Sequence, residues 1–470
     1  MTDLSFAQSR FGLGGRGDSA LESVADPRGW VLSQIGELGP LPGNLATRAT
    51  VASDLQEYRD QRRAAKSALS EVPPAMTASP GARPPELKLA AKEQRDIYVQ
   101  LVGARVNAAI TTSAPFMERM AHFWANHFAV SAQKQTTIGF AGLLESDAIR
   151  PNVAGRFGDM LLAVERHPAM LLYLDQATSI GPKSMAGARA QRNGKTRGLN
   201  ENLAREIMEL HTLGVRSGYD QADVTEFARA LTGWTVAGIG NSPAQRFLQA
   251  APGDFTFAGV LHEPGARTVM GKRYGQDGEA QARSVIADLA VHPATARHVA
   301  TKLARHFAAD DPPPAMVSRL EKAFLRSGGD LPTVYRALVA SPEAWEIAKP
   351  KFRTPWDWTI ASLRAASVKE VKGQMAVGLL RQLGQPVWQP SSPAGFDDIA
   401  ASWAGPDALV RRVEAAQRIA QASSGIDARA LAPTLLGARL MPETATAIGR
   451  AESPQTAMAL LLASPEFLRR

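Results

Sequence analysis

The sequence contains no cysteine among its 470 residues, so disulfides, thiolate metal sites and cysteine nucleophiles are excluded. It also lacks an apolar run of about 18 residues, the length that a membrane-spanning helix requires, and no transmembrane segment is expected. Residues 1–6 show no basic stretch followed by an apolar one. This pattern predicts that a cleavable secretory signal is absent and favours a cytoplasmic location.

Motifs of several common enzyme classes are absent as well. There is no Gly-x-Ser-x-Gly, which argues against a typical serine hydrolase, and no His-Glu-x-x-His metal motif. Residues 193–196 resemble the end of a phosphate-binding loop, but Arg189 stands where the first glycine of that motif is required. No strand precedes the segment either, so we reject a nucleotide-binding loop.

The composition is that of a basic, soluble protein with ample material for a core. Hydrophobic residues make up 45% of the chain, enough for one large core or two smaller ones. The net charge of +8 indicates weak affinity for anions. Basic and acidic residues are interleaved and no nucleic-acid-binding motif is present, so we expect no nucleic-acid partner.

Stretches rich in alanine, leucine and arginine predict a mainly α, multi-helix globular fold. We expect one helical unit over 1–470, with a division into an N-terminal part, 1–235, and a C-terminal part, 236–470, as the alternative. The clearest predicted helices are 47–71, 86–109, 115–128, 201–213, 221–231, 293–307, 313–326 and 331–340.

One region shows a β pattern. Two short apolar runs within 254–271 flank a Glu-Pro-Gly-Ala turn, which predicts one small β-hairpin. A second irregular stretch, 178–198, carries five basic residues and no acid. Two interpretations of it stay open: a mobile basic flap over the following helix, and a disordered surface loop.

The predicted helix 115–128 carries His127 near the centre of its apolar face. Glu118, Arg119, His122 and Asn126 fall on the opposite side of the same helical wheel. A buried imidazole needs a hydrogen-bond partner or a metal. His127 is therefore either a core histidine bonded to a backbone carbonyl, or a functional histidine paired with a carboxylate.

The predicted helix 201–213 combines an apolar face with five ionisable residues: Glu201, Arg205, Glu206, Glu209 and His211. Glutamate and arginine recur every four residues, which is typical of a solvated ion-pair ladder contributing about 0.3–0.5 kcal/mol per pair. The alternative is catalytic. Glu206 would then turn towards His127 or His211, while Arg205 would hold Glu201 or Glu209.

Under the catalytic interpretation, His127, Arg205, Glu206, Glu209 and His211 form an active site. Trp124, Trp234 and His262 would line its substrate pocket, although such aromatics are more often plain core. A set of carboxylates and histidines suits a divalent metal as well as metal-free acid–base work. The candidate metal ligands are Glu206, Glu209, His127 and His211, and the identity of any cofactor is open.

Three segments carry a family resemblance: Phe123-Trp124-Ala125-Asn126-His127-Phe128, residues 200–214, and Ala230-Leu231-Thr232-Gly233-Trp234. Weaker matches include residues 391–396. With these segments the chain resembles the bacterial family catalogued as domain of unknown function 1800, from the opening Phe11-Gly12-Leu13-Gly14 to the closing 463–467. It departs from the family at Phe396, where tryptophan is usual, and at Glu263, which follows His262 where aspartate is more usual.

The resemblance implies a largely helical protein of a family that is often exported, which makes a periplasmic location the alternative to the cytoplasm. It also implies a partner, because relatives are commonly encoded beside a sulfatase-like protein of the domain of unknown function 1501 family. Two hypotheses follow. One is an enzyme, metal-dependent or not, that hydrolyses or oxidises an exported or envelope substrate. The other is a non-catalytic helical scaffold that binds the sulfatase-like partner.

Overall fold

The computed structural model describes residues 4–18, 26–71, 85–194, 198–239, 250–348, 350–423 and 425–470. Within them 60% of the structure is helical, which confirms the mainly α fold. The N-terminal elements are α1 (Leu4–Arg10), α2 (Pro27–Leu32), α3 (Arg48–Glu71), α4 (Pro85–Thr111), α5 (Pro115–His127), α6 (Ala141–Leu144), α7 (Phe157–Glu165), α8 (Pro168–Tyr173), α9 (Met185–Arg192), α10 (Asn202–Glu206) and α11 (Gln221–Leu231).

Ten further α-helices occupy the described part of the C-terminal half. They are α12 (Glu279–Ala290), α13 (Pro293–Phe307), α14 (Pro314–Ser327), α15 (Leu331–Ala340), α16 (Pro355–Ala365), α17 (Gly373–Gln382), α18 (Pro406–Ala422), α19 (Ala428–Leu436), α20 (Pro442–Gly449) and α21 (Pro454–Ala463). Between α11 and α12 lie four short strands: β1 (Trp234–Val236), β2 (Phe255–Phe257), β3 (Arg267–Val269) and β4 (Lys272–Tyr274).

Local signals fix many helix starts. The Asp220 carboxylate accepts a hydrogen bond from the backbone N–H of Asp223, and the Asp223 carboxylate accepts one from the backbone N–H of Asp220, which closes a capping box before α11. His167 and His292 each accept a hydrogen bond from the backbone two residues on and are each followed by proline, which opens α8 and α13 in the same way.

The predicted helix 201–213 changes its winding part-way. α10 ends at Glu206, and residues Ile207–His211 continue as one π-helical turn. Such turns are rare and occur mostly as single bulges, often at functional sites. The bulge leaves Thr212 outside the helix, where its hydroxyl donates to the carbonyl of Ile207 at 2.6 Å.

The predicted hairpin over 254–271 is wrong in its pairing. β2 pairs antiparallel with β1, and β3 pairs antiparallel with β4, so the two apolar runs do not pair with each other. The β structure of the described residues therefore starts at Trp234 and extends to Tyr274. Each sheet has two strands, and each buries side chains against helices.

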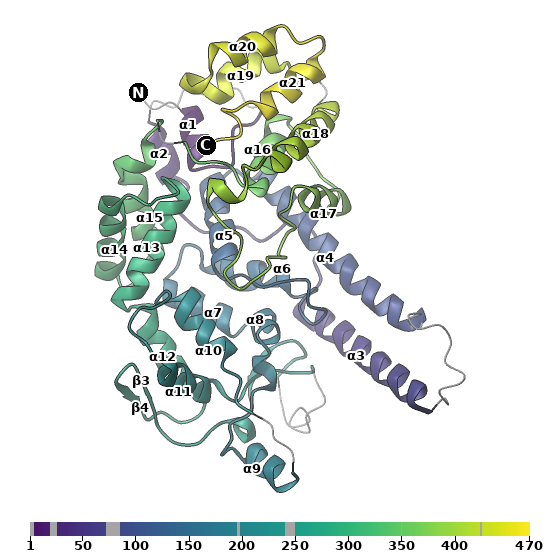
Figure 1. The fold of residues 1–470 in the computed structure, drawn as a ribbon, viewed down its shortest axis with the longest axis vertical. Coiled ribbons are helices and arrows are strands. Elements are labelled where there is room, and N and C mark those ends of the chain that lie inside the picture. Colours follow the sequence, from purple (N-terminus) through teal and green to yellow (C-terminus); the bar gives the residue numbers. More distant parts are fainter. Residues whose placement is uncertain are drawn as a thin grey trace.

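The described part of the 178–198 stretch contains α9, which packs on the 3₁₀ turn Gly259–Leu261. The backbone N–H of Gly181 donates to the carbonyl of Leu261 at 2.9 Å. Figure 1 places α9 at the lower end of the molecule. This part of the stretch therefore lies against the 254–271 region; residues 195–197 lie outside the described residues.

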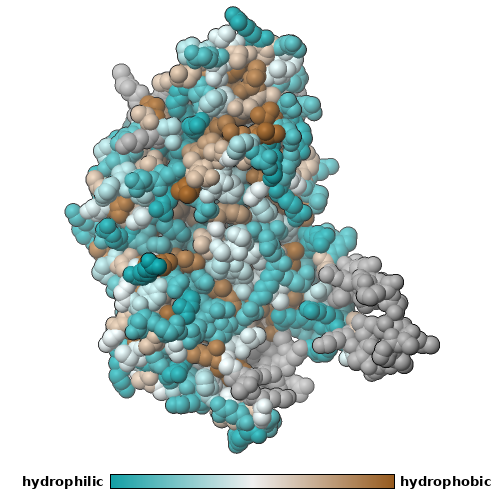
Figure 2. Space-filling model, viewed as in Figure 1, coloured by the Kyte–Doolittle hydropathy of each residue, from teal (hydrophilic) through white to brown (hydrophobic). Residues whose placement is uncertain are grey.

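One cluster of buried apolar side chains runs from Phe6 to Leu468. In Figure 1, α3 and α4 form a long pair beside α17, α13 to α15 cover one side, and α18 to α21 lie at the end that holds both termini. The face seen in Figure 2 is mostly hydrophilic, with scattered apolar residues over its upper part. Among the described residues, no helix is long and apolar enough to cross a membrane.

Candidate functional site

Helix α5 is buried on both of its sides. Its apolar face packs in the core as expected, but Glu118, Arg119 and His122, on the face expected to be polar, are buried too. Glu118 accepts two hydrogen bonds from Arg150, at 2.7 and 3.0 Å. These bonds and the contact with His122 outweigh the cost of burial and lower the pKa of Glu118 to about 2.

His127 lies inside the protein, as the helical pattern predicts, with 1% of its surface exposed. Its Nε2 is 3.1 Å from the carbonyl oxygen of His211. A carbonyl can only accept, so Nε2 carries the hydrogen and the lone pair resides on Nδ1. Nδ1 is buried without a hydrogen-bond partner among the described residues. Burial, followed by the charge of Lys302, holds the pKa of His127 well below its usual range.

His211 and Glu165 form a fully buried pair, with Nδ1 of the histidine 2.7 Å from Oε1 of the glutamate. Glu206 therefore does not provide the carboxylate that contacts His211, and it makes no hydrogen bond to His127 among the described residues. Glu206 is partly buried, and its desolvation raises its pKa. No motif in the sequence around Glu165 indicates that it pairs with His211.

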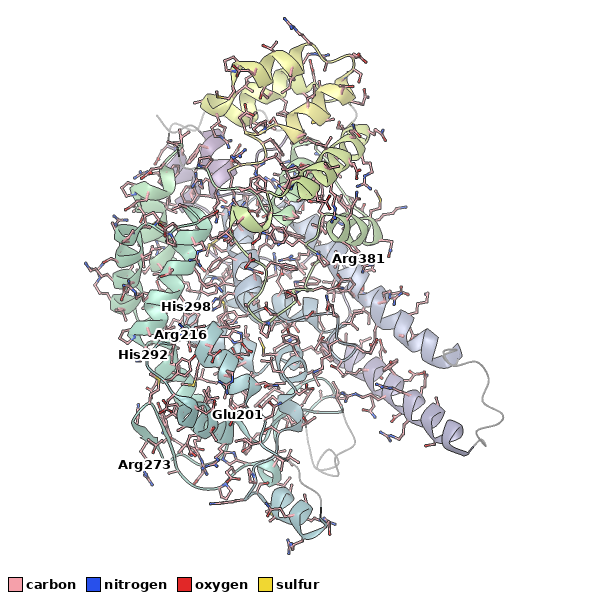
Figure 3. The ribbon with its side chains drawn as sticks, in the orientation of Figure 1. Glu201, Arg216, Arg273, His292, His298 and Arg381 are labelled. Atoms are coloured by element: carbon pink, nitrogen blue, oxygen red, sulfur yellow. The ribbon has the colours of Figure 1, made fainter. Side chains whose placement is uncertain are left out.

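Arg205 forms the ladder predicted from its spacing and takes no part in that buried pair. Its guanidinium lies 3.3 Å from Glu201 and 3.5 Å from Glu209, and it also donates to Gln221 at 2.8 Å. Arg205, Glu201 and Glu209 are all partly exposed. Figure 3 shows Glu201 on the lower half of the molecule, at the start of α10. Such exposed pairs contribute little stability.

The three residues predicted to line a substrate pocket lie in separate surroundings. Trp124 is buried beside His127, with ring centroids 5.2 Å apart, and its indole N–H donates to the hydroxyl of Tyr335 at 2.8 Å. Trp234 is buried in β1. His262 is bonded through Nδ1 to the carbonyl of Thr232 at 2.8 Å.

The four predicted metal ligands, Glu206, Glu209, His127 and His211, are not gathered around one point. Across the described residues, no group of three or more histidine, aspartate or glutamate side chains has an arrangement that could hold a metal ion.

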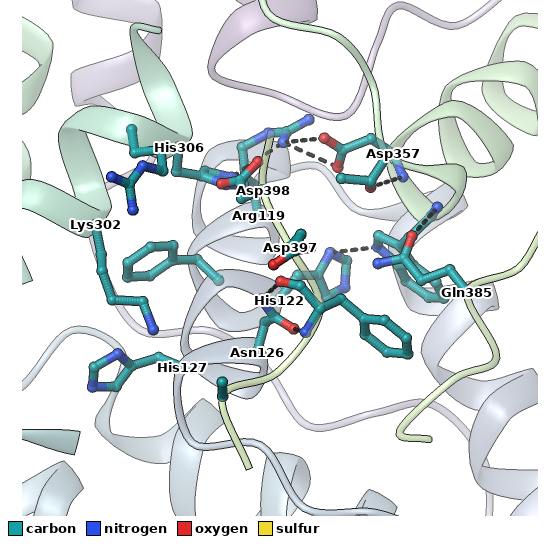
Figure 4. Close-up of a pocket in the computed structure, with 16 residues that line it drawn as sticks. Arg119, His122, Asn126, His127, Lys302, His306, Asp357, Gln385, Asp397 and Asp398 are labelled. Carbon is teal, nitrogen blue, oxygen red and sulfur yellow. Dashed lines mark hydrogen bonds and ion pairs between the residues drawn. The ribbon is translucent and has the colours of Figure 1, made fainter. Parts of the chain in front are cut away.

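His127 lines a polar cavity of about 190 Å³ between α5, α13, α16 and the segment that precedes α18 (Figure 4). Sixteen residues line this cavity: Arg119, His122, Phe123, Asn126, His127, Lys302, Arg305, His306, Thr354, Trp356, Asp357, Gln385, Ala394, Phe396, Asp397 and Asp398. Of the residues predicted for the site from sequence, only His127 is among them.

The segment 394–398 is held against α5 by a close backbone approach. Asn126 donates to the carbonyl of Phe396 and accepts from its N–H, both at 2.8 Å. Gly395 has φ +83°, and a side-chain carbon there would lie 2.3 Å from the carbonyl oxygen of Asn126. Only glycine fits that position without displacing the backbone. The turn brings Asp398 to the cavity.

Two carboxylates of the cavity wall are already matched by cations. Asp357 accepts from Arg119, with both oxygens at 3.1 Å, and lies 3.0 Å from Nε of Arg470. Asp398 lies 2.5 Å from Nδ1 of His306 and 3.6 Å from the Lys351 ammonium. The His306 ring and the Lys351 ammonium hold the pKa of Asp398 at about 2 despite burial. Burial lowers the pKa of His306 to about 4, so at pH 7 His306 is neutral and binds Asp398 through a hydrogen bond, and Lys351 is the cation.

Lys302 differs from the other cations of the wall. Across the described residues its ammonium makes no hydrogen bond and no ion pair. Figure 4 shows the side chain extending along the cavity with its amine towards His127. Burial, the largest cause, lowers its pKa to about 8. A lysine amine with such a pKa is uncharged in a useful fraction of molecules at neutral pH.

The chain was compared with known proteins. Residues 7–469 match the family described as protein of unknown function (DUF1800). The chain belongs to the DUF1800 family. No curated protein and no solved structure matches it.

Two segments that carry the resemblance to DUF1800 proteins, 123–128 and 391–396, meet at the cavity through Asn126 and Phe396. Lys302, His306 and Asp398 are not among the site residues predicted from the sequence. Lys302 and His306 are four residues apart, so they share one face of α13, and that spacing was the available signal. Nothing in the sequence indicated that Asp398 would reach them.

Proposed function

We propose that this DUF1800 protein is an enzyme that carries out acid–base catalysis on a small carbonyl compound bound in the cavity, with His127 as the general base. One observation carries the proposal: His127 lines the cavity, and its Nδ1 has no hydrogen-bond partner among the described residues, while its Nε2 is fixed by the His211 carbonyl. A general base needs an available lone pair in a fixed orientation.

The surroundings keep His127 in the neutral form that a general base requires. Its lowered pKa keeps the imidazole neutral at pH 7, because burial and the Lys302 charge disfavour the imidazolium. After Nδ1 takes a proton from water or substrate, the Lys302 ammonium would stabilise negative charge that develops on a carbonyl oxygen. A base and a stabilised oxyanion are the groups that attack of water on a carbonyl requires, so hydrolysis is the reaction class we propose.

The size of the cavity restricts the substrate. Sites for drug-sized ligands usually measure roughly 300–1,000 Å³. A cavity of about 190 Å³ suits a molecule of a few heavy atoms, or one group of a larger substrate. Its wall is rich in charged and amide side chains, which favours a polar ligand.

Paired substitutions at two histidines test the proposal. His298 donates its Nε2 hydrogen to the carbonyl of Leu210 at 3.1 Å, as His127 does to His211, but His298 does not line the cavity. Figure 3 marks His298 on α13. The variants are His127→Gln and His298→Gln, each of which offers the carbonyl an amide donor. Product formation from a panel of small esters, amides and oxo acids is followed by proton NMR.

We expect wild-type protein to turn over at least one class of the panel. His127→Gln should lower kcat/KM about 10²- to 10⁴-fold, the usual contribution of a general base, while His298→Gln retains most activity. Equal losses in both variants would indicate a packing role for both histidines. That result, or a fully active His127→Gln protein, would overturn the proposal.

A scaffold that binds the sulfatase-like partner is the second candidate, and one observation favours it. Met375 on α17 and Val410 and Val413 on α18 are exposed apolar side chains, at 66%, 59% and 46%. Size-exclusion chromatography with a purified sulfatase-like protein of the domain of unknown function 1501 family tests this candidate. Co-elution that Val410→Asp abolishes would support it, and separate elution at micromolar concentrations would count against it.

A further inference from the structure

We propose that Lys302 binds its substrate covalently, as an imine with a small oxo acid, and that Arg305 holds the carboxylate of that acid. The inference rests on the proposed function in that it uses the same cavity and the same base, His127. It adds a nucleophile and a substrate class.

The first argument is the isolation of the Lys302 amine. Arg119, in the same wall, is bound to Asp357 and to the carbonyl of Gly12. Lys351, next to the cavity, is 2.5 Å from Asp310 and also contacts Asp398. Each of these cations is fixed by carboxylates and cannot easily release a proton. Lys302 has no such partner among the described residues, so its nitrogen is available to react.

The second argument is the protonation state of Lys302. With a pKa of about 8, about a tenth of the molecules carry an uncharged amine at pH 7. An ordinary lysine is almost entirely protonated at that pH. Desolvation and a neighbouring cation are the usual means by which proteins activate lysine for attack on carbonyls. Burial of Lys302, together with the charge of Arg305, outweighs the charge of Asp398, which raises the pKa of Lys302.

The third argument concerns Arg305, three residues after Lys302 on α13 and also in the cavity wall. Its Nε donates to the carbonyl of Asp310 at 3.2 Å, and it forms no ion pair among the described residues. The buried Asp357 and the partly buried Asp398 already bind Arg119 and Lys351, and Asp397 is exposed and accepts from Ser402. A guanidinium without a carboxylate partner, in the same cavity wall as a reactive amine, fits a ligand that carries a carboxylate.

The covalent step balances without any oxidant or reductant. The Lys302 ammonium loses a proton to Nδ1 of His127, and the free amine attacks the carbonyl carbon. The oxygen becomes a hydroxyl by taking a proton from the attacking nitrogen, and His127 then returns its proton so that the hydroxyl leaves as water. One ammonium and one carbonyl give one protonated imine and one water molecule. Attack of water on the imine reverses the sequence and frees the lysine.

Reductive trapping tests the inference without relying on turnover. Full-length protein is incubated with glyoxylate or pyruvate and sodium cyanoborohydride, which reduces an imine to a stable secondary amine. Tryptic peptides are then mapped by mass spectrometry, where a modified Lys302 also blocks cleavage after that residue. Lys322, exposed on α14, serves as the internal reference lysine.

We expect a single early adduct on Lys302, formed at least about tenfold faster than on Lys322, as an amine of lowered pKa and bound substrate should give. Lys302→Arg should abolish this adduct, and Lys322→Arg should leave it. Arg305→Gln should slow trapping of glyoxylate but not of propanal, which has no carboxylate. Since the wild-type map is read directly, a variant that fails to fold does not prevent the test.

Labelling spread over exposed lysines, or none on Lys302, would overturn the inference. The two proposals can fail separately. If His127→Gln abolishes turnover while Lys302 is never trapped, the role of His127 as a general base is supported and the imine on Lys302 is refuted. If Lys302 is trapped selectively but no compound of the panel is converted, the binding of carbonyl compounds by Lys302 is supported and the proposed catalysis is refuted.

Discussion

The Nε2 hydrogen of His127 points at the carbonyl oxygen of His211 across 3.1 Å, inside the protein. The acceptor is the last residue of the π-helical turn Ile207–His211. One side chain of α5 is thus oriented by the backbone of the segment that the sequence marked as most unusual. The bond fixes the tautomer of His127 and leaves the lone pair on Nδ1, which has no hydrogen-bond partner among the described residues.

His127→Ala should destabilise the protein by about 1–3 kcal/mol, because the buried His211 carbonyl loses its donor. The free energy of unfolding from urea denaturation checks this value. His127→Gln, which retains a donor, should be less destabilising. An alanine variant as stable as wild type would mean that the bond contributes nothing.

Glu165→Gln and Glu206→Gln should affect stability differently. Glu165 makes a 2.7 Å bond to the fully buried His211, and a charge-assisted bond of this kind contributes about 1.5–3 kcal/mol, most of which the glutamine variant should lose. Glu206 has no such bond. Urea denaturation of both variants at pH 7 compares them, and a larger loss for Glu206→Gln would contradict this assignment.

The effect of Glu206→Gln should also depend on pH. Burial raises the pKa of Glu206, so the folded protein binds that proton more tightly than the unfolded chain. Ionisation of Glu206 therefore lowers stability as pH rises above the unfolded value near 4.5. Glu206→Gln should be more stable than wild type at pH 7 and equal to it near pH 4. Unfolding measured at both pH values checks this, and an opposite trend would show that the folded state stabilises the Glu206 charge.

The wild-type protein should lose stability as pH falls from about 6.5 to 4. Burial lowers the pKa of His298 and of His306 to about 4, so in that window the unfolded chain binds protons that the folded protein does not. His298 faces Lys302, His211 and Arg305, and its replacement by glutamine should reduce the slope of stability against pH. An unchanged slope in His298→Gln would contradict the assignment of this residue.

Gly395→Ala should destabilise the segment that brings Asp398 to the cavity. The residue has φ +83° and no space for a side chain, and strain of this kind costs about 1–3 kcal/mol. Gly378→Ala is the matched control, since Gly378 lies in the exposed face of α17 with open space around it. The control should gain up to about 1 kcal/mol. Thermal unfolding of both proteins checks the contrast.

The sequence by itself determined the helices and many of their ends. The predicted limits of α11, α13 and α15 agree with the structure, because caps, prolines and helical periodicity act within a few residues. The same local pattern placed His127 inside. The pattern placed Glu118, Arg119 and His122 on the polar face of the helix, but these residues are buried. A helical wheel shows that one face must be buried, and it cannot show that other elements also cover the opposite face.

Only the tertiary structure decided strand pairing and the membership of the site. The run 255–257 pairs with 234–236 because pairing depends on which strand lies alongside, and the sequence does not contain that information locally. His211 meets Glu165, and His127 shares a cavity with Lys302 and Asp398, across long separations in the chain. Ionisable residues acquire their pKa from such neighbours and from burial. Neither the neighbours of a residue nor its burial are determined until the helices pack.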